Sequence, residues 1–544
     1  MLFALLAALL AAPSADLRAA APSARRTIRG EALSAHVRFL ADDLLEGRGT
    51  GTRGHAIAAR YVAAQLQSAG LEPAGERGSW FQAVPLRAMA VDGPGCALEV
   101  AGEGYASPGE VLFYPRGGAA LDEVSAPLVF AGYGISAPYY GYDDAATDLR
   151  GKIAVILFGA PRSDRPDFFP AAASAVLSDV QVKSQLLASR GAVGVLMVVT
   201  PQTLEKVAPW SRLVDSNAFE QMVWMEGERP GGGRLLPFAA LPPQAFDRLL
   251  AKAGRAGAAT GLYAEAAAGR VRPFPLGIDA RLRVAAKVRD LTSDNVAGLL
   301  RGADPRLSRE HVVLTAHLDH LGIGPAVGGD SIYNGATDDA AGVAALLEIA
   351  RAFRGLGRAP PRSILFLAVT AEEKGLQGSD YFVHHPTVPI DSIVAGVNSD
   401  FPFGRWQPRD LVVRGAEHST LERQARAAAA ALDMKLSPDP SPEMILFIRS
   451  DQYSFVKQGI PSVFPTAGWL DERGGTARNQ AILEDWLHSH YHQPSDEWDP
   501  RLDWEWTAQE ARAYFLLALG IGIDPQRPHW NRGDVFEKLF GSVP

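Results

Sequence analysis

From about residue 285 onward, short apolar runs alternate with amphipathic segments, and this alternation restricts the chain to few architectures. The runs HVVLTA, SILFLAVT, SIVAGVN and IPSVFP are almost continuously apolar, whereas AGVAALLEIARAF and LERQARAAAAAL repeat apolar residues at helical spacing. Continuous apolar runs are typical of strands that are buried on both faces. Strands that alternate with helices form a sheet covered by helices. We therefore predict an α/β fold, a three-layer sandwich of a central mixed β-sheet between helices.

The segment before this region has a different pattern. Residues 31–70 contain two stretches with helical spacing, ALSAHVRFLADDLLEG and GHAIAARYVAAQLQSAG, on either side of a Gly-rich loop, GRGTGTRG. A Gly-rich loop can bind an anion where a strand precedes it. No strand precedes this one, so we interpret it as a connection.

A β-rich segment then interrupts the chain. The runs APLVFAGYG, KIAVILFG and GVLMVV predict strands around one helix, VQVKSQLLASRGA. We assign residues 25–124 to the N-terminal part of the main domain. Residues 125–280 form an inserted β-rich module, and residues 281–544 form the main part of that domain.

The N-terminus is typical of a secretory signal peptide. The apolar run from Leu2 to Ala12 is shorter than the about 20 residues that a membrane-spanning helix needs. Small residues follow, with candidate cleavage sites near Ala15 and Ala21. We expect a signal peptide over residues 1–24 and an exported protein, periplasmic or secreted, with no membrane span.

Composition excludes two classes of site. The formal net charge is -8, and no basic stripe indicates a nucleic-acid interface. Cys96 is the only cysteine, so a thiolate metal cluster is excluded. Any metal site must rest on histidine, aspartate and glutamate.

Residues of these three types follow three of the predicted strands. His317 and Asp319 follow HVVLTA, Glu372 and Glu373 follow SILFLAVT, and Asp400 follows SIVAGVN. Ligands of open α/β sheets bind outside the carboxyl ends of the strands. We therefore expect these side chains to meet at one edge of the sheet.

Two further segments can complete a metal site. Asp338 and Asp339 lie in the turn NGATDDAAG, and HSHYHQPSDEWD carries His488, His490 and His492. Zinc accepts nitrogen and oxygen ligands at about 2.0 to 2.2 Å. A pair of zinc ions needs roughly five side chains if one carboxylate bridges them. Manganese and cobalt accept the same ligand types.

These motifs together resemble a known family. The segments HLDHLG, GDSIYNGATDDAAG, TAEEKGLQGS, NSD and YHQPSD resemble those of the bacterial leucyl-type di-zinc aminopeptidases. Glutamate carboxypeptidase, glutaminyl cyclase and the transferrin receptor are relatives of that family. The likeness covers residues 30–75 and 290–520. The inserted module, with GKIAVILF and SRGAVGVLMV, is similar to a protease-associated domain.

The resemblance implies two Zn²⁺ ions per chain. Asp338 would bridge them. His317 and Asp400 would hold one ion, and Glu373 and His492 would hold the other. The motif YHxPxD favours His492 over the two other histidines of its segment.

The resemblance also implies an aminopeptidase that acts on peptides through a metal-bridging hydroxide. Glu372 would be its general base, and Asp319 would accept a hydrogen bond from His317. Tyr491 would polarise the scissile carbonyl. The peptide bond after the bridging aspartate is often cis in this family. The family commonly has asparagine where this chain has Asp339, which adds a negative charge near the site.

Three alternatives stay open at this point. A dipeptidase or glutamyl-type carboxypeptidase would need an arginine for the substrate carboxylate, and Arg405, Arg414 and Arg449 are candidates. Glutaminyl cyclisation needs one zinc ion, which the five-ligand set disfavours. A metal-free, receptor-like binding protein would lack ligands, and none is missing here.

Overall fold

The computed structural model describes residues 15–163, 165, 167–206, 208–227, 229–230 and 235–541. The chain divides into two compact units. Unit 1 contains Met1–Val84, Thr292–Ser441 and Arg449–Pro544, and unit 2 contains Pro85–Leu291 and Pro442–Ile448. The inserted module was expected to begin at residue 125, whereas unit 2 already begins at Pro85. Most of the expected signal peptide, residues 1–14, lies outside the described residues.

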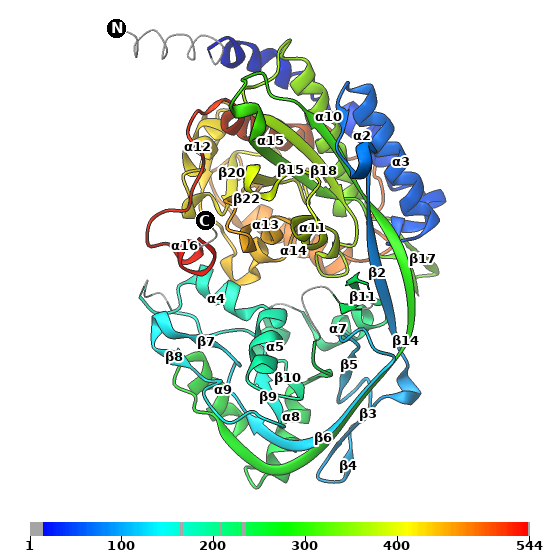
Figure 1. Cartoon of the computed structure of the whole chain (residues 1–544), viewed down its shortest axis with the longest axis vertical. Helices are drawn as coiled ribbons and strands as arrows, with labels where there is room; N and C mark the ends of the chain where they lie inside the picture. The colour runs from blue at the N-terminus through cyan, green and yellow to red at the C-terminus, as the bar shows by residue number, and fades with distance from the viewer. Residues whose placement is uncertain are drawn as a thin grey trace. The chain divides into compact units, whose positions relative to one another are not determined.

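Unit 1 is built on a mixed sheet in the order β1–β14–β18–β15–β19–β22–β20–β21. Its four middle strands, β18, β15, β19 and β22, run parallel to one another, which confirms the predicted central mixed sheet (Figure 1). The strands of unit 1 are β1 (Glu72–Pro73), β15 (His311–His317), β16 (Gly322–Val327), β17 (Asp330–Tyr333), β18 (Ser363–Val369), β19 (Ile393–Asn398), β20 (Asp410–Arg414), β21 (Lys435–Ser437) and β22 (Ser462–Ala467). Two long strands, β2 (Phe81–Val91) and β14 (Phe274–Leu300), have residues in both units.

Helices cover both faces of this sheet, and the side chains of β15 show the two layers. Val312 and Leu314 belong to the core on the side of α10 and α15, whereas Val313 belongs to a second core with Phe382 of α11 and Phe455 of α13. Neighbouring side chains of a strand point to opposite faces, so a strand buried on both faces is apolar throughout. The helices of unit 1 are α2 (Gly30–Leu40), α3 (Arg53–Ser68), α10 (Ala341–Arg354), α11 (Gln377–His384), α12 (Glu422–Ala430), α13 (Gln452–Lys457), α14 (Ala477–Ser489), α15 (Trp504–Ile523) and α16 (Val535–Phe540).

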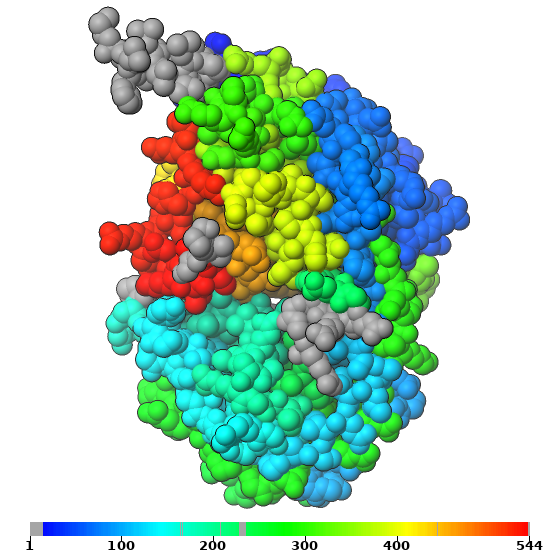
Figure 2. Space-filling model, in the orientation of Figure 1, coloured from blue at the N-terminus to red at the C-terminus, as the bar shows by residue number. Residues whose placement is uncertain are grey.

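The N-terminal segment is part of the core of unit 1. Residues 15–25 are helical, and Leu17, Ala21 and Ala24 of this helix are buried among the residues that α10 and α15 contribute. Helix α2 also packs against α10 and α15. In the space-filling view, the blue N-terminal residues lie directly against green segments from the middle of the chain (Figure 2).

Unit 2 has a mixed sheet of its own. Strands β6, β9, β10 and β13 run parallel, and β5 and β14 flank them in the antiparallel sense. The predicted succession of a strand, a helix and a strand is present as β9 (Ile153–Leu157), α5 (Val180–Ser189) and β10 (Gly194–Val198). The other strands and α-helices of unit 2 are β3 (Ala97–Val100), β4 (Glu103–Gly104), β5 (Leu112–Tyr114), β6 (Leu121–Phe130), β7 (Ser136–Ala137), β8 (Tyr142–Asp143), α4 (Ala171–Ser178), α6 (Pro201–Lys206), α7 (Trp210–Asn217), β11 (Gln221–Glu226), β12 (Arg229–Pro230), β13 (Phe238–Leu241), α8 (Pro243–Lys252) and α9 (Ala259–Ala267). Its assignment as a protease-associated domain stays a prediction.

Among the described residues, no helix is both long enough and apolar enough to cross a membrane.

Candidate metal centre and active site

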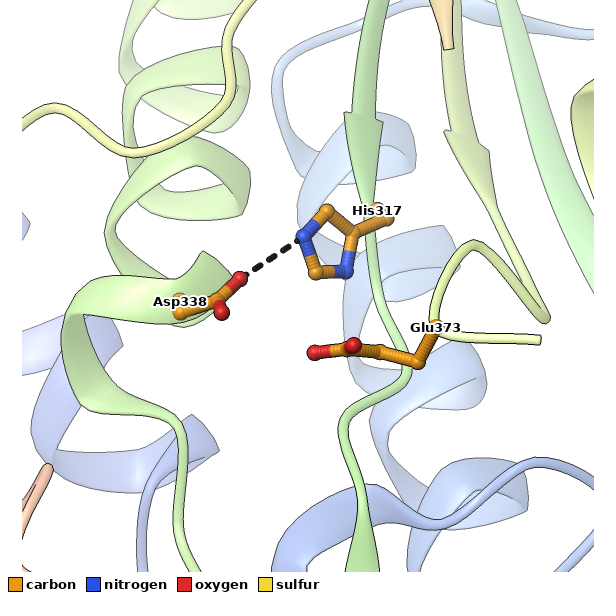
Figure 3. A group of neighbouring side chains, drawn as sticks. All are labelled: His317, Asp338 and Glu373. Carbon is orange, nitrogen blue, oxygen red and sulfur yellow. Dashed lines mark ion pairs between the residues drawn. The ribbon is translucent and has the colours of Figure 1, made fainter. Parts of the chain in front are cut away.

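The carboxyl ends of three parallel strands lie at one level of the unit 1 sheet. The register pairs His317 of β15 with Val369 of β18, and Thr315 of β15 with Asn398 of β19. The polar residues that follow these strands therefore reach the same edge. Figure 3 shows His317 at the end of its strand, Asp338 from the turn before α10 and Glu373 from the loop after β18, with their polar groups directed to one space.

Asp338 lies between the two histidines. Its Oδ1 is 3.0 Å from Nε2 of His317, and its Oδ2 is 3.2 Å from Nε2 of His492. Two ligands at about 2.1 Å from one tetrahedral zinc ion are separated by about 3.4 Å. The distance from each oxygen of Asp338 to its histidine is therefore close to the distance between two ligands of one zinc ion. The two oxygens face different histidines, as the oxygens of a bridging carboxylate would.

The two remaining predicted ligands extend these pairs. Asp400 Oδ1 is 3.6 Å from Nε2 of His317, and Glu373 Oε2 is 3.2 Å from Nε2 of His492. The five side chains thus form two groups that share Asp338. This is the division that the sequence predicted, and the role of each residue as a ligand stays a prediction.

A different ligand group, formed by His317, Asp339 and Asp400, is also compatible with the distances. One atom from each of these side chains lies within 4.8 Å of the others. However, the carboxylate of Asp339 already accepts three backbone hydrogen bonds. Oδ1 accepts from the N–H groups of Gly342 and Phe401, and Oδ2 accepts from the N–H of His317. A carboxylate oriented by three donors is less available to a cation, so we assign Asp339 to the support of the site. The peptide bond between Asp338 and Asp339 is cis, as expected.

The tautomer of His317 is set by a backbone group. Its Nδ1 lies 3.0 Å from the main-chain oxygen of Asp319. A carbonyl oxygen only accepts, so Nδ1 carries the proton and Nε2 is free to bind a metal. His317 therefore pairs with Asp319, as predicted, but it donates to the backbone oxygen of Asp319 and not to its carboxylate. Its carboxylate instead accepts from the Thr50 hydroxyl and from the Glu372 N–H, at 2.9 and 3.1 Å.

The electrostatics of the site indicate an excess of buried negative charge. Burial lowers the pKa of His492, but the charges of Glu373 and Asp338 outweigh it and raise that pKa to about 9. Burial likewise lowers the pKa of His317, and Glu372 and Asp338 raise it well above its ordinary value. The negative charge of these carboxylates favours the protonated, positively charged form of both histidines. Divalent cations bound at the same place would balance that negative charge equally well. The donor set and its charge therefore fit two metal ions of the zinc type.

The two adjacent glutamates have opposite shifts. Burial raises the pKa of Glu372 well above its ordinary value, and the charges of Glu373 and Asp451 add to this effect. Burial also acts to raise the pKa of Glu373, but His492 and His320 outweigh it and hold that pKa well below its ordinary value. Glu373 is therefore the carboxylate that stays anionic, and Glu372 is the one that favours a proton.

Two further residues support the site: His320, which the sequence indicates only as a structural or pocket-lining residue, and Asp496, to which the sequence assigned no role. His320 is fully buried, and its Nδ1 is 2.6 Å from Oε1 of Glu373, the oxygen that does not face His492. Asp496 accepts hydrogen bonds from the N–H groups of Thr337 and Asp338 and so holds the bridging turn. Both lie inside the segments HLDH and YHQPSD that carried the resemblance, so position within a motif was the available signal.

The C-terminal segment brings Tyr491 and His492 to the site. The two rings stack with their centroids 3.8 Å apart. Burial raises the pKa of the Tyr491 hydroxyl, and Arg449 opposes this rise. In the same segment, His488 is exposed and His490 lies beside Ser495, whereas Nε2 of His492 lies 3.2 Å from both Asp338 and Glu373.

The model of peptidase family M28 matches residues 295–517 of this chain. This match supports the resemblance that the motifs carry. A curated relative, a probable leucine aminopeptidase 2 from Aspergillus oryzae, is 29% identical over 189 residues, which are 33% of this chain and 35% of that protein. The chain thus spans about a third of the length of this relative.

A solved structure of an aminopeptidase has a similar fold. An aminopeptidase from Aneurinibacillus sp. strain AM-1 superposes with a TM-score of 0.52 at 20% identity, and the match covers 93% of this chain and 96% of that one. BSAP, a zinc aminopeptidase from Bacillus subtilis, has a TM-score of 0.44 at 19% identity, covering 90% of this chain and 94% of that one.

Proposed function

We propose that this chain is a di-zinc exopeptidase that removes the N-terminal residue of peptides. The observation that carries the proposal is the position of Asp338, with one carboxylate oxygen 3.0 Å from His317 and the other 3.2 Å from His492. Asp400 and Glu373 complete two ligand groups around it. The match to the model of peptidase family M28 and the relative named as a probable leucine aminopeptidase support the same activity.

The residues of the site have separate roles in this proposal. Bound zinc would polarise the scissile carbonyl and lower the pKa of a water molecule. Glu372 would take the proton of the attacking water and pass it to the leaving amine, a role suited to a carboxylate whose pKa burial raises. The Tyr491 hydroxyl, kept neutral by its raised pKa, would donate a hydrogen bond to the carbonyl oxygen as negative charge develops there.

The test compares the wild type with Glu372→Gln, which keeps the size of the side chain and removes its base. We expect two zinc ions per chain in both proteins, by elemental analysis. We expect the variant to lose about 10² to 10⁴ of kcat on aminoacyl chromogenic substrates. N-acetylated versions of the same substrates are the control and should be inert. Equal activity of the variant and the wild type would remove Glu372 from its role, and a zinc-free protein after reconstitution would refute the site.

A second candidate is an exopeptidase that recognises a free carboxylate at the end of its substrate. Arg414 is engaged by Asp439 through two contacts of 3.0 Å, and Arg405 stacks over Phe403. Arg449 is exposed, and its charge acts on Tyr491. If Arg449 binds the free carboxylate of the substrate, Arg449→Ala should raise KM for peptides with a free C-terminus. The KM for the corresponding C-terminal amides should be unchanged. An equal effect on both would favour the aminopeptidase.

We also propose that the protein is exported, with cleavage near Ala15 rather than near Ala21. Supporting this choice, Leu17, Ala21 and Ala24 are buried in the core of unit 1. Cleavage after Ala21 would remove the first two of these residues. The N-terminal sequence of the mature protein checks the proposal, and a start beyond residue 21 contradicts it.

A further inference from the structure

The Gly-rich loop GRGTGTRG, residues 47–54, has no part in the function proposed above. It was expected to be only a connection between two helices. In unit 1 it lies directly beside the segments that carry the candidate ligands, since Gly49 forms a β-bridge with His320. The close approach requires glycine: a Cβ on Gly47, whose φ is +65°, would lie 2.3 Å from the backbone oxygen of Tyr333.

Arg48 of this loop is a fully buried cation bound to backbone oxygens. Its Nε donates to Leu318 at 2.9 Å, and its Nη atoms donate to Asn334 and Gly335 at 2.6 and 2.9 Å. Leu318 follows the ligand His317, and Gly335 begins the turn that carries Asp338. One guanidinium therefore joins the segments of two candidate ligands.

The charge of Arg48 also suits this place. Burial lowers its pKa to about 10, and the nearby charges of Asp339 and Asp319 oppose that shift. A guanidinium offers five N–H donors in a fixed plane, and it stays charged at this pKa at neutral pH. Arg48 thus brings a positive charge to a centre crowded with carboxylates and satisfies its donors on carbonyl groups, leaving the carboxylates free.

Thr50 connects the same loop to the proposed base. Its Oγ1 donates to Oδ2 of Asp319 at 2.9 Å, and Oδ1 of Asp319 accepts from the N–H of Glu372 at 3.1 Å. Thr50 and Asp319 are both buried. The hydroxyl therefore orients a carboxylate, and this carboxylate holds the backbone of Glu372. A freely rotating Asp319 side chain would leave that N–H unpaired.

We infer that Arg48 and Thr50 are positioning residues, and that residues 47–50 of the loop are a clamp that holds His317, Asp338 and Glu372 at the spacing of the active site. Arg48 sets the two ligand segments, and Thr50 sets the base through Asp319. The inference rests on the proposed function for its catalytic consequence. The geometric consequence, an ordered backbone at Glu372, is independent of the substrate.

The test compares Thr50→Val, which keeps the shape and loses the hydroxyl, with Thr50→Ser, which keeps the hydroxyl. Partners that orient the residues of metal sites typically contribute 10- to 100-fold. We expect Thr50→Val to lower kcat by about that factor with KM unchanged, and Thr50→Ser to restore kcat. Amide hydrogen exchange, measured by mass spectrometry on the metal-free protein, should be faster at Glu372 in Thr50→Val only.

Thr52→Val is the matched control in the same loop. The Thr52 hydroxyl donates to Gly49 and caps α3 by accepting from the His55 N–H, and it has no contact with Asp319. This variant should melt at a lower temperature with kcat and exchange at Glu372 unchanged.

Two results would overturn the inference: wild-type kcat and exchange in Thr50→Val, or equal impairment of Thr50→Val and Thr50→Ser. If the wild type hydrolyses no peptide, the proposed function fails, and the exchange at Glu372 still decides the role of the loop.

The role of Arg48 is tested with Arg48→Lys. One ammonium cannot reach the carbonyls that the guanidinium joins, so we expect zinc to be lost to a competing chelator at about 10- to 100-fold lower chelator concentration. Unchanged zinc retention in a folded Arg48→Lys protein would exclude Arg48 from the clamp. If Arg48→Lys does not fold, the comparison of Thr50→Val with Thr50→Ser still tests the inference.

Discussion

Both units of the molecule bury ionisable groups, but they balance them differently. In unit 2, Lys183 is buried and donates to the backbone oxygens of Leu157 and Gly159. Asp144 is buried in the same unit and accepts from two backbone N–H groups and the Tyr142 hydroxyl. In unit 2, the buried Lys183 and the buried Asp144 are therefore each satisfied by neighbouring neutral groups.

Unit 1 instead gathers carboxylates around two histidines. Asp338, Glu373 and Asp400 direct oxygens at His317 or His492, and the nearby Asp451 has a pKa raised to about 7, chiefly by burial. Burying charge without compensation costs several kcal/mol per ion. A structural cluster is balanced within the fold, as in unit 2. An excess of buried negative charge at the ends of strands instead indicates a site that binds a cation.

The largest expected effect comes from removing the shared ligand. Asp338→Ala should lose zinc-dependent hydrolysis entirely, because both ligand groups contain this residue. Zinc at 100 times its Kd should stabilise the wild type by about 2.7 kcal/mol, and a thermal melt should show no such shift in Asp338→Ala.

Lys183→Met is the comparison variant in unit 2. It should keep both the hydrolysis and the stabilisation by zinc, since Lys183 bonds only to backbone oxygens of its own unit. A loss of zinc stabilisation in Lys183→Met would show that the two clusters are not separate.

The next largest expected effect is the pH dependence of the free energy of unfolding, which arises from Lys183 in unit 2. Burial lowers the pKa of Lys183 from 10.5 to about 7. Between these values the unfolded chain holds a proton that the folded chain lacks, so the free energy of unfolding rises with pH. The slope from this group is up to about 1.4 kcal/mol per pH unit.

Denaturant unfolding across pH 7 to 10.5 would measure this slope. The difference in stability between the wild type and Lys183→Met should change with pH in this window and be constant below it. A pH-independent difference would mean that Lys183 has an ordinary pKa in the folded protein.

The smallest effect is expected at Asp339, where the family commonly has asparagine. An amide has one acceptor oxygen, so Asp339→Asn would leave the backbone N–H of His317 facing an NH₂ group. We expect a loss of about 1 to 3 kcal/mol in the free energy of unfolding, with two zinc ions retained. Loss of one zinc ion would instead make Asp339 a ligand, which is the other grouping its position allows.

Much of the fold of unit 1 was predictable because its signals are local. A strand buried on both faces is apolar along most of its length, and β15 and β18 are buried at every position, with the apolar runs VVL and ILFLAV. The candidate ligands were predictable for a related reason, since His317, Glu373 and Asp400 follow strands whose ends meet at one edge. The β-rich module was recognised from β9 and β10, but its strands β3 to β5 are short and its first residue lies earlier than expected.

The sequence by itself determined the order of strands and helices and the residue types of the candidate site, because periodicity and motif spacing lie within short stretches of chain. Only the tertiary structure decided which atoms meet. It brought His492 to within 3.2 Å of Asp338 and Glu373. It paired His317 with the backbone oxygen of Asp319, and it brought Arg48 and Thr50 to residues about 270 positions away. Such contacts depend on how separate loops converge, and no local pattern specifies that convergence.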